Sequence, residues 1–232
     1  MTLDKGAFIY PYQSFPFPTN YGEKVSFPVY VWLIEGAEEP ILVDVGCSDE
    51  GFAKYRVSST EIKDIASIEE SLASFGISTL DIKTIIMTHL DIDHILNAKK
   101  FPNAKFIVQE EELRFVRNPH PMYARRCHQE LYEGLKFQTI RGDTEIVPDV
   151  DAIFTPGHTV GGQSVAVATE HGKVVICGMC TIDDNFSDEG DIISGMHSDP
   201  FEAYDSIVKI RKIADSVLPL HSQRLLYTRS IP

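Results

Sequence analysis

The chain has 232 residues, of which 43% are hydrophobic and 24% charged, an ordinary globular composition with enough apolar mass for a core. This length favours one domain of the larger α/β kind, spanning residues 1–232. The formal net charge of −13 argues against nucleic acid and acidic membranes as partners, because both attract basic surfaces.

Cysteine usage and the N-terminal sequence indicate the compartment. The 4 cysteines are too sparse for a disulfide scaffold, and Cys177 and Cys180 are expected to be free thiols. The N-terminal stretch lacks the basic and apolar regions of a signal peptide. No apolar run approaches the roughly 20 residues that cross a bilayer. We therefore expect a reduced, cytoplasmic protein.

The first half of the chain begins with an aromatic and proline-rich stretch, which predicts an extended arm or loop at about residues 1–28. This arm would cover a hydrophobic surface; the alternative roles are a substrate wall or a subunit contact, which would suit a homodimer. Strands are predicted at 28–36 and 40–46. Apolar residues at helical spacing then predict a helix over 59–76, ended by Gly76.

The rest of the chain alternates strands and helices. A strand over 82–88 is followed by helix, turn and strand over 95–109, and two further helices are expected at 110–118 and 122–135. The remaining predictions are strands at 150–158, 162–170, 173–178 and 216–223, and a helix at 199–214 with Pro200 at its first position. This mixture, without repeat or linker, predicts a layered α/β body.

The segment "THLDIDH", residues 88–94, is the first candidate for chemistry. It contains His89, Asp91, Asp93 and His94, all of types that bind divalent metals, directly after a predicted strand. Taken alone, such a cluster is as consistent with a solvated turn as with a metal site. Two further histidines, His158 and His221, also follow apolar strands, at a sheet edge where sites are commonly built.

Several quoted segments together resemble the metallo-β-lactamase fold, and within it the branch that opens acyl-homoserine lactones. They are "LVDVGCS", "IIMTHLDIDH", "FPNAKFIVQEEELRFVRNP", "TPGHTVGGQSV" and "LPLH", and they cover nearly the whole chain. The resemblance implies a four-layer αββα sandwich with a metal site at one sheet edge. It implies one metal on His89, Asp91 and His158, and a second on Asp93, His94 and His221. Asp44 resembles the buried aspartate that orients the site's loop.

Three departures from the family pattern affect the site. Asp91 stands where the family usually has histidine, either as a ligand or as a cap of the following helix. The family's bridging aspartate falls on Met179 or Cys180. Asp183 and Asp184 are interpreted as solvated loop charges, the alternative being that they reach the metals in place of the missing bridge. The tyrosine that helps orient the carbonyl is replaced by Ile182.

The expected chemistry is hydrolysis of a lactone, ester or related cyclic carbonyl compound. Three protein ligands per metal leave open positions, so that a metal-bound hydroxide can attack a small-molecule substrate, with Asp93 carrying a proton to the leaving oxygen. The cofactor would be one or two divalent ions: zinc by resemblance, or iron or manganese because Asp91 is a harder ligand than imidazole. The alternatives are a non-hydrolytic small-molecule binding protein and an iron- or manganese-centred redox or isomerisation enzyme.

Overall fold

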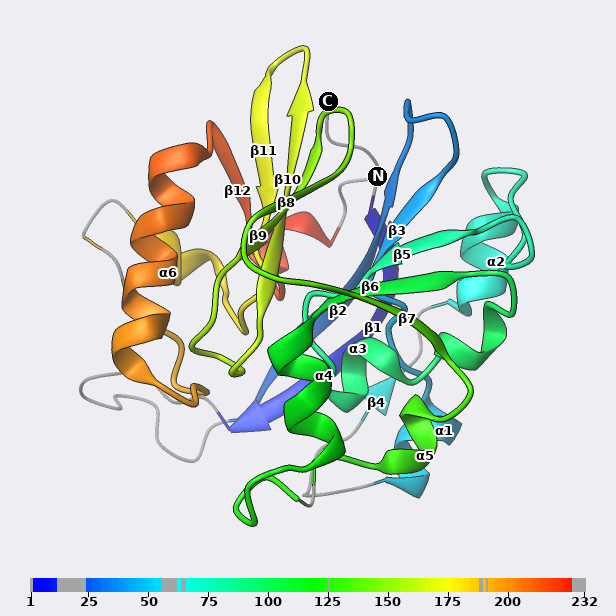
Figure 1. Ribbon diagram of the computed structural model, residues 1–232, viewed down its shortest axis with the longest axis horizontal. Helices are drawn as coiled ribbons and strands as arrows, with labels where there is room; N and C mark the ends of the chain where they lie inside the picture. The colour runs from blue at the N-terminus through cyan, green and yellow to red at the C-terminus, as the bar shows by residue number, and fades with distance from the viewer. Residues whose placement is uncertain are drawn as a thin grey trace.

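The computed structural model describes residues 2–11, 24–55, 62–63, 66–124, 126–187, 190 and 192–226. Two β-sheets lie face to face, with α6 outside one sheet and the other helices outside the second (Figure 1). The predicted α/β class and the four-layer αββα sandwich are confirmed.

The larger sheet has seven strands in the order β4-β1-β2-β3-β5-β6-β7. Strands β3, β5, β6 and β7 are mutually parallel, whereas β1 and β2 are antiparallel. The bounds are β1 Thr2–Pro11, β2 Lys24–Ile34, β3 Ile41–Val43, β4 Ile62–Lys63, β5 Thr84–Ile86, β6 Lys105–Gln109 and β7 Lys136–Ile140.

The smaller sheet has five strands in the order β12-β11-β10-β9-β8, of which only β11 and β12 are parallel neighbours. The bounds are β8 Thr144–Val147, β9 Val150–Phe154, β10 Gln163–Thr169, β11 Gly172–Ile176 and β12 Ser216–Leu218.

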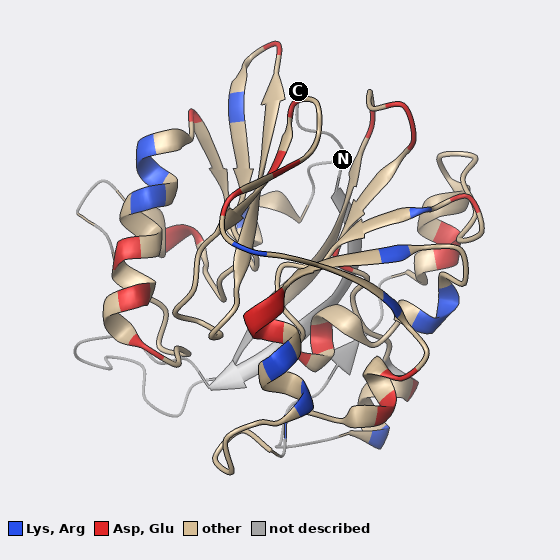
Figure 2. Ribbon diagram, viewed as in Figure 1, with Lys and Arg blue, Asp and Glu red and all other residues tan. Residues whose placement is uncertain are grey.

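The helices are short apart from α6, which runs from Pro200 to Ile213 after the N-cap Asp199. The others are α1 Asp49–Lys54, α2 Ile68–Ala73, α3 Ile92–Ile95, α4 Glu110–Arg117 and α5 Gln129–Tyr132, with 3-10 turns η1 Ala98–Lys100, η2 Asp183–Phe186 and η3 Gln223–Leu225. Glutamates begin α4 and arginines end it, which complements the helix dipole (Figure 2). Across the described part of the chain, no helix combines the length and apolar character of a bilayer span.

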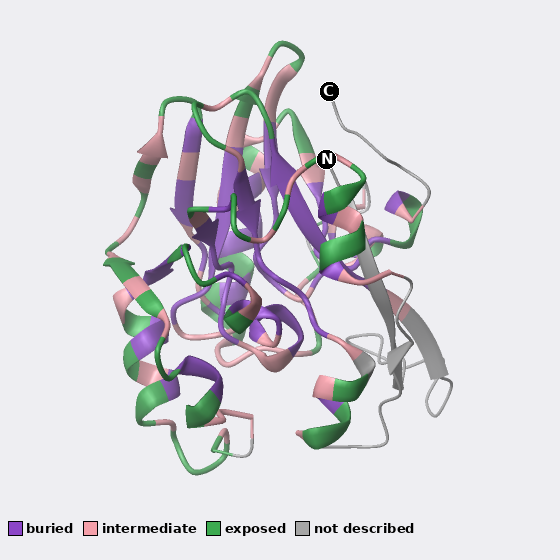
Figure 3. Ribbon diagram, turned by 90° about the vertical axis from the view of Figure 1, so that its right-hand side faces the viewer, coloured by how far each residue is buried: buried purple, intermediate pink, exposed green. Residues whose placement is uncertain are grey.

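The core is divided by the period-2 alternation of the strands. In β2, Tyr30 and Trp32 face the second sheet and pack with residues such as Val165, whereas Val31 and Leu33 face the helices. A third cluster lies between the smaller sheet and α6. Buried residues accordingly concentrate on the strands of both sheets, with exposed residues on the outer helices (Figure 3). This rigid double sheet supports the loops at its edge.

Two helix predictions are wrong in extent. Among the described residues of the helix expected over 59–76, only α2 is helical, and Ile62 lies instead in β4, paired with β1; residues 59–61 and 64–65 lie outside the described residues. The helix α2 begins where Ser67 and Glu70 supply a capping box. Over 122–135, most of the expected helix is a series of turns, and only Gln129–Tyr132 is helical.

The N-terminal arm expected at about 1–28 is partly a strand. Thr2–Pro11 pairs with β2 as β1, and Lys24 begins β2 itself, while residues 12–23 lie outside the described residues. The sequence pattern also missed β7 and β8, whose residues are mostly half-exposed and therefore lack a strong apolar signal.

Candidate metal centre

The candidate site lies where several strands of both sheets end. His89 follows β5, His158 follows β9 and His221 follows β12, and the loops after these strands meet at one end of the sandwich. His94 lies in α3, the short helix that continues the loop from His89. All six predicted ligands come together there, although they belong to three separate segments of the chain.

The first group consists of His89, Asp91 and His158, whose candidate ligand atoms lie within 4.8 Å of one another. Asp91 Oδ2 is 3.8 Å from His89 Nε2 and 3.7 Å from His158 Nε2. His89 and His158 are buried, and Asp91 is mostly shielded, with 16% of its side chain exposed. One carboxylate oxygen and two imidazole nitrogens therefore converge on a common point.

The second group consists of Asp93, His94 and His221, again with candidate ligand atoms within 4.8 Å. His94 Nε2 lies 3.1 Å from Asp93 Oδ2, and all three residues are buried. The ring centroids of His89 and His94 are 4.3 Å apart, so the two groups adjoin each other. This arrangement suits a pair of neighbouring ions.

His89 and His94 are oriented by hydrogen bonds on the sides of their rings away from the centre. Asp44 Oδ2 accepts from Thr88 Oγ1 at 2.7 Å and from His94 Nδ1 at 2.8 Å. Because Thr88 uses its hydroxyl proton on Asp44, its oxygen accepts from His89 Nδ1 at 2.9 Å. Asp44 itself has a φ of 59°, a conformation unusual for a residue with a side chain. It performs the orienting role that the family resemblance implied.

His158 and His221 are oriented in the same way, by hydrogen bonds from Nδ1 to backbone carbonyls. His158 Nδ1 donates to the carbonyl of Met196 at 2.7 Å, and His221 Nδ1 donates to that of Pro28 at 2.8 Å. In all four histidines Nδ1 is thus occupied and Nε2 is left for the centre, as in metal-ligating histidines generally. His94 Nε2 is buried and faces Asp93 Oδ2 at 3.1 Å without hydrogen-bond geometry, which fits two atoms that share a metal ion.

Burial and charge set the protonation of the groups. Burial lowers the pKa values of His89 and His158, and it lowers that of His221 to about 4, so these imidazoles are neutral at pH 7. Burial would raise the pKa of Asp93, but His94 outweighs it and the pKa is lowered. Burial would also lower the pKa of His94, but Asp93 and Asp44 outweigh it and raise the pKa, so without metal this imidazole holds a proton. A metal ion would have to displace that proton, because neutral imidazoles and ionised carboxylates are the forms that bind metal.

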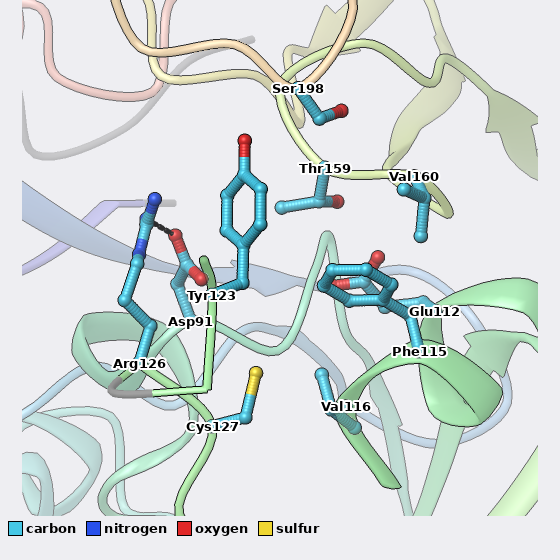
Figure 4. A pocket seen from close by; sticks show the side chains of 10 residues that line it. All are labelled: Asp91, Glu112, Phe115, Val116, Tyr123, Arg126, Cys127, Thr159, Val160 and Ser198. Atoms are coloured by element: carbon cyan, nitrogen blue, oxygen red, sulfur yellow. Dashed lines mark hydrogen bonds and ion pairs between the residues drawn. The ribbon is translucent and has the colours of Figure 1, made fainter. Parts of the chain in front are cut away.

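Asp91 behaves as a site residue and not as a helix cap. It occupies the N-cap position of α3, yet its side chain makes no capping hydrogen bond. Instead, Arg126 forms a close ion pair with Asp91 Oδ2, the oxygen that faces His89 and His158. Arg126 lies in the turns before α5, and Figure 4 shows its guanidinium beside the Asp91 carboxylate.

At the position of the family's bridging aspartate, Met179 and Cys180 point to different surroundings. Met179 is buried in the apolar cluster with Ile207 and Ile210 of α6. Cys180 is close enough to Asp93 for that carboxylate to raise the pKa of its thiol, after the larger effect of burial. Met179 is therefore packed against α6 and away from the two ligand groups, neither of which includes Cys180.

The nearby acidic residues do not replace the bridge. Asp183 accepts hydrogen bonds from the Ser222 hydroxyl at 2.6 and 2.8 Å and lies 3.4 Å from Arg224. Neither Asp183 nor Asp184 belongs to the two groups found among the described residues. The same holds for the other four histidines of the chain, which are His120, His128, His171 and His197.

Some contributors to the site have no distinctive sequence pattern. Thr88 reads as the end of a strand, Arg126 as one of two adjacent arginines, and Glu112 as one of three glutamates in a row. Glu112 is nevertheless 1% exposed, and burial raises its pKa to about 7. Only the close approach of separate loops reveals these residues.

The chain that carries these two ligand groups is similar to known proteins. Residues 26–178 match the metallo-beta-lactamase superfamily. An N-acyl homoserine lactonase of Bacillus cereus is 32% identical over 209 residues, covering 83% of this chain and 76% of that protein. The chain belongs to the metallo-beta-lactamase superfamily, in its lactonase-like branch.

Further members of this superfamily extend the comparison over the whole chain. The N-acyl homoserine lactonase AiiA of Bacillus thuringiensis subsp. kurstaki is 29% identical over 210 residues, covering 86% of this chain and 81% of that protein. A solved N-acyl homoserine lactone hydrolase with the product N-hexanoyl-L-homoserine at its catalytic metal center has a TM-score of 0.79 and 26% identity. The alignment covers 99% of this chain and 95% of that one. The superfamily membership and the ligand groups identify this chain as a metallohydrolase with residues to hold one or two divalent ions.

Proposed function

We propose that the protein hydrolyses the ring ester of an N-acyl homoserine lactone or a closely related lactone. The observation that carries the proposal is the pair of adjoining ligand groups, present in a chain that is similar to lactonases over most of its length. The relatives act on lactones by name, and a structural neighbour holds a ring-opened product at its metal centre.

In this proposal His89, Asp91 and His158 hold one ion, and Asp93, His94 and His221 hold the other. When bound, such ions polarise the substrate carbonyl and lower the pKa of a coordinated water. Three protein ligands leave coordination positions open on each ion, as catalytic centres require. The hydrogen bonds from Nδ1 of each histidine fix the ring that presents Nε2 to the ion.

Asp93 is the proposed proton carrier. Its lowered pKa keeps the carboxylate ionised at neutral pH, so that it can accept a proton. It is also the only carboxylate of the second group, beside the centre and 7% exposed. From there Asp93 Oδ would deliver the proton to the ring oxygen as the ester bond breaks.

An apolar wall beside the first group suits an acyl chain. Phe115, Tyr123 and Val160 line a pocket that also contains Asp91 and Arg126 (Figure 4). The aromatic rings of Phe115 and Tyr123 lie 5.6 Å apart, edge to face. In this proposal the acyl chain lies against these side chains, which must move apart to admit it, because the space between them accommodates about one water molecule.

The metal is zinc in this proposal, with iron or manganese as the alternative favoured by Asp91. A carboxylate oxygen is a harder ligand than the imidazole that the family usually has at this position. A cytoplasmic location and a homodimer stay predictions from the sequence.

The test is to strip the protein of metal, reload it with zinc, iron or manganese, and measure ring opening of N-hexanoyl-homoserine lactone by proton release and product mass. We expect two metal equivalents per chain and turnover that depends on them, with slower reaction on a linear ester. Metal-loaded protein that binds lactone without opening it would favour the binding protein. A different product would favour the redox or isomerisation enzyme.

A further inference from the structure

Glu112 is a buried carboxylate outside both ligand groups. It lies in the first turn of α4 and is 1% exposed, whereas the side chains of its neighbours Glu110 and Glu111 are 44% and 59% exposed. Burying a carboxylate is costly unless its oxygens find hydrogen-bond donors. The donors that Glu112 has found are therefore informative.

Both carboxylate oxygens of Glu112 accept backbone hydrogen bonds from loops that carry ligands. Oε1 accepts from the N–H of Leu90 at 3.0 Å, and Oε2 accepts from the N–H of Gly161 at 3.0 Å. Leu90 lies between His89 and Asp91, and Gly161 is three residues after His158. One side chain thus links the two loops that supply the first group.

Two further contacts hold these loops against α5 and α4. Tyr132 of α5 donates its hydroxyl proton to the carbonyl of Leu90 at 3.2 Å, so that the peptide groups on both sides of Leu90 are held. A Cβ on Gly161 would lie 2.2 Å from the backbone nitrogen of Glu112, so this loop crosses α4 in direct backbone contact. Only glycine permits that approach.

We propose that Glu112 is a positioning residue that assembles the first ligand group by tying the loop of His89 and Asp91 to the loop of His158. This inference rests on the proposed metal centre. The second group is supported elsewhere, because His94 is held by Asp44 and His221 by the carbonyl of Pro28. Glu112 therefore acts on one ion and not on the other.

Glutamine at position 112 separates this role from simple packing. It has nearly the same shape, but its amide has one acceptor oxygen and an NH2 group, which would face an N–H donor. One of the two links is lost, and the loops of the first group become free to separate. Glu111→Gln is the matched control, because it makes the same change at an exposed site of the same helix turn.

The experiment is a zinc titration of metal-free full-length protein, with melting curves of each variant before loading. We expect Glu112→Gln to weaken one of the two zinc-binding steps by about 10- to 100-fold, the range for residues that orient metal ligands. The other step should be unchanged, and Glu111→Gln should leave both unchanged.

Two background variants show which group is affected. With His221→Ala disabling the second group, Glu112→Gln should weaken the remaining zinc by the same factor. With His158→Ala disabling the first group, it should have no effect. If Glu112→Gln fails to fold, Tyr132→Phe removes only the hydroxyl bond to Leu90 and should weaken the same step by a smaller factor.

Equal weakening of both steps, or no change in either, would overturn the role of Glu112. Wild-type protein that binds no zinc, iron or manganese would instead overturn the proposed function itself, and this inference with it. The two failures are therefore distinguishable in one set of titrations.

Discussion

Arg126 forms an ion pair with the oxygen of Asp91 that also faces His89 and His158. The usual family ligand at this position is a neutral imidazole, whereas here a carboxylate and a guanidinium stand together. The pair adds no net charge to the site, yet it changes the donor atom from nitrogen to a harder oxygen. In the proposed metal centre, Asp91 and Arg126 together therefore take the place of one histidine.

Asp91→His should raise the share of zinc bound when zinc, iron and manganese compete, because it restores a nitrogen donor. Asp91 makes no capping hydrogen bond, so the roughly 1 kcal/mol of a lost cap should not appear in the melting curve. The measurement is competitive metal loading with a parallel melt. An unchanged metal preference together with a lowered melting temperature would show Asp91 to be a cap.

Adding Arg126→Gln to Asp91→His should strengthen zinc binding relative to Asp91→His alone. In Asp91→His, the Arg126 guanidinium no longer pairs with a carboxylate at position 91, and its positive charge repels the nearby zinc ion. The comparison is the zinc Kd of the two variants at the same ionic strength. Weaker binding by the double variant would contradict the charge-compensation account.

Alanine at Asp93, His94 or His221 should remove one metal equivalent and lower turnover by at least about 100-fold, because each supplies one of only three ligands to its ion. Metal analysis and proton-release assays check this. His171→Ala is the matched control, since His171 is exposed and outside both groups. Full metal content and turnover in all three variants would refute the assignment of the second group.

Aspartate introduced at positions 179 and 180 should have opposite consequences. Met179→Asp places a charge in the cluster beneath α6 and should cost about 3 kcal/mol or more of unfolding free energy. Cys180→Asp places the carboxylate beside Asp93, which should lower stability without metal and restore it when zinc is added. Melting curves with and without zinc measure both; a zinc response of Met179→Asp alone would reverse the assignment.

All 4 cysteines should be counted as thiols in unreduced, denatured protein, as the structure has them. In the native metal-free protein, burial raises the thiol pKa to about 11 for Cys177 and about 12 for Cys180. A raised pKa favours the neutral thiol, so alkylation at pH 8 should be much slower before unfolding than after. Two missing thiols would reveal a disulfide.

The fold was predictable because its buried strands carry strong signals. Continuous apolar runs mark β2, β5 and β11, and Pro200 after Asp199 marks the start of α6. The helix expected over 59–76 fails because the spacing of Ile62 and its neighbours fits a helix face, whereas pairing with β1 is a contact that local spacing cannot reveal. Weakly apolar strands such as β7 are missed because their residues are exposed or half-exposed.

That these six residues come together was predictable, because they lie in recognisable motifs in the segments that follow β5, β9 and β12. Their supports were not, because these depend on which loops meet. Glu112 is indistinguishable in sequence from Glu111. What distinguishes Glu112 in the structure is that its carboxylate accepts hydrogen bonds from the N–H groups of Leu90 and Gly161. The choice between Met179 and Cys180 is likewise decided by the direction of the chain after β11.

In the proposed centre two adjoining ions are held by these six side chains. An anomalous difference map from crystals of the zinc-loaded protein, recorded at the zinc absorption edge, would locate both ions. We predict one peak among His89, Asp91 and His158 and a second among Asp93, His94 and His221. Zinc located elsewhere, or no ordered zinc in either group after loading, would contradict the account.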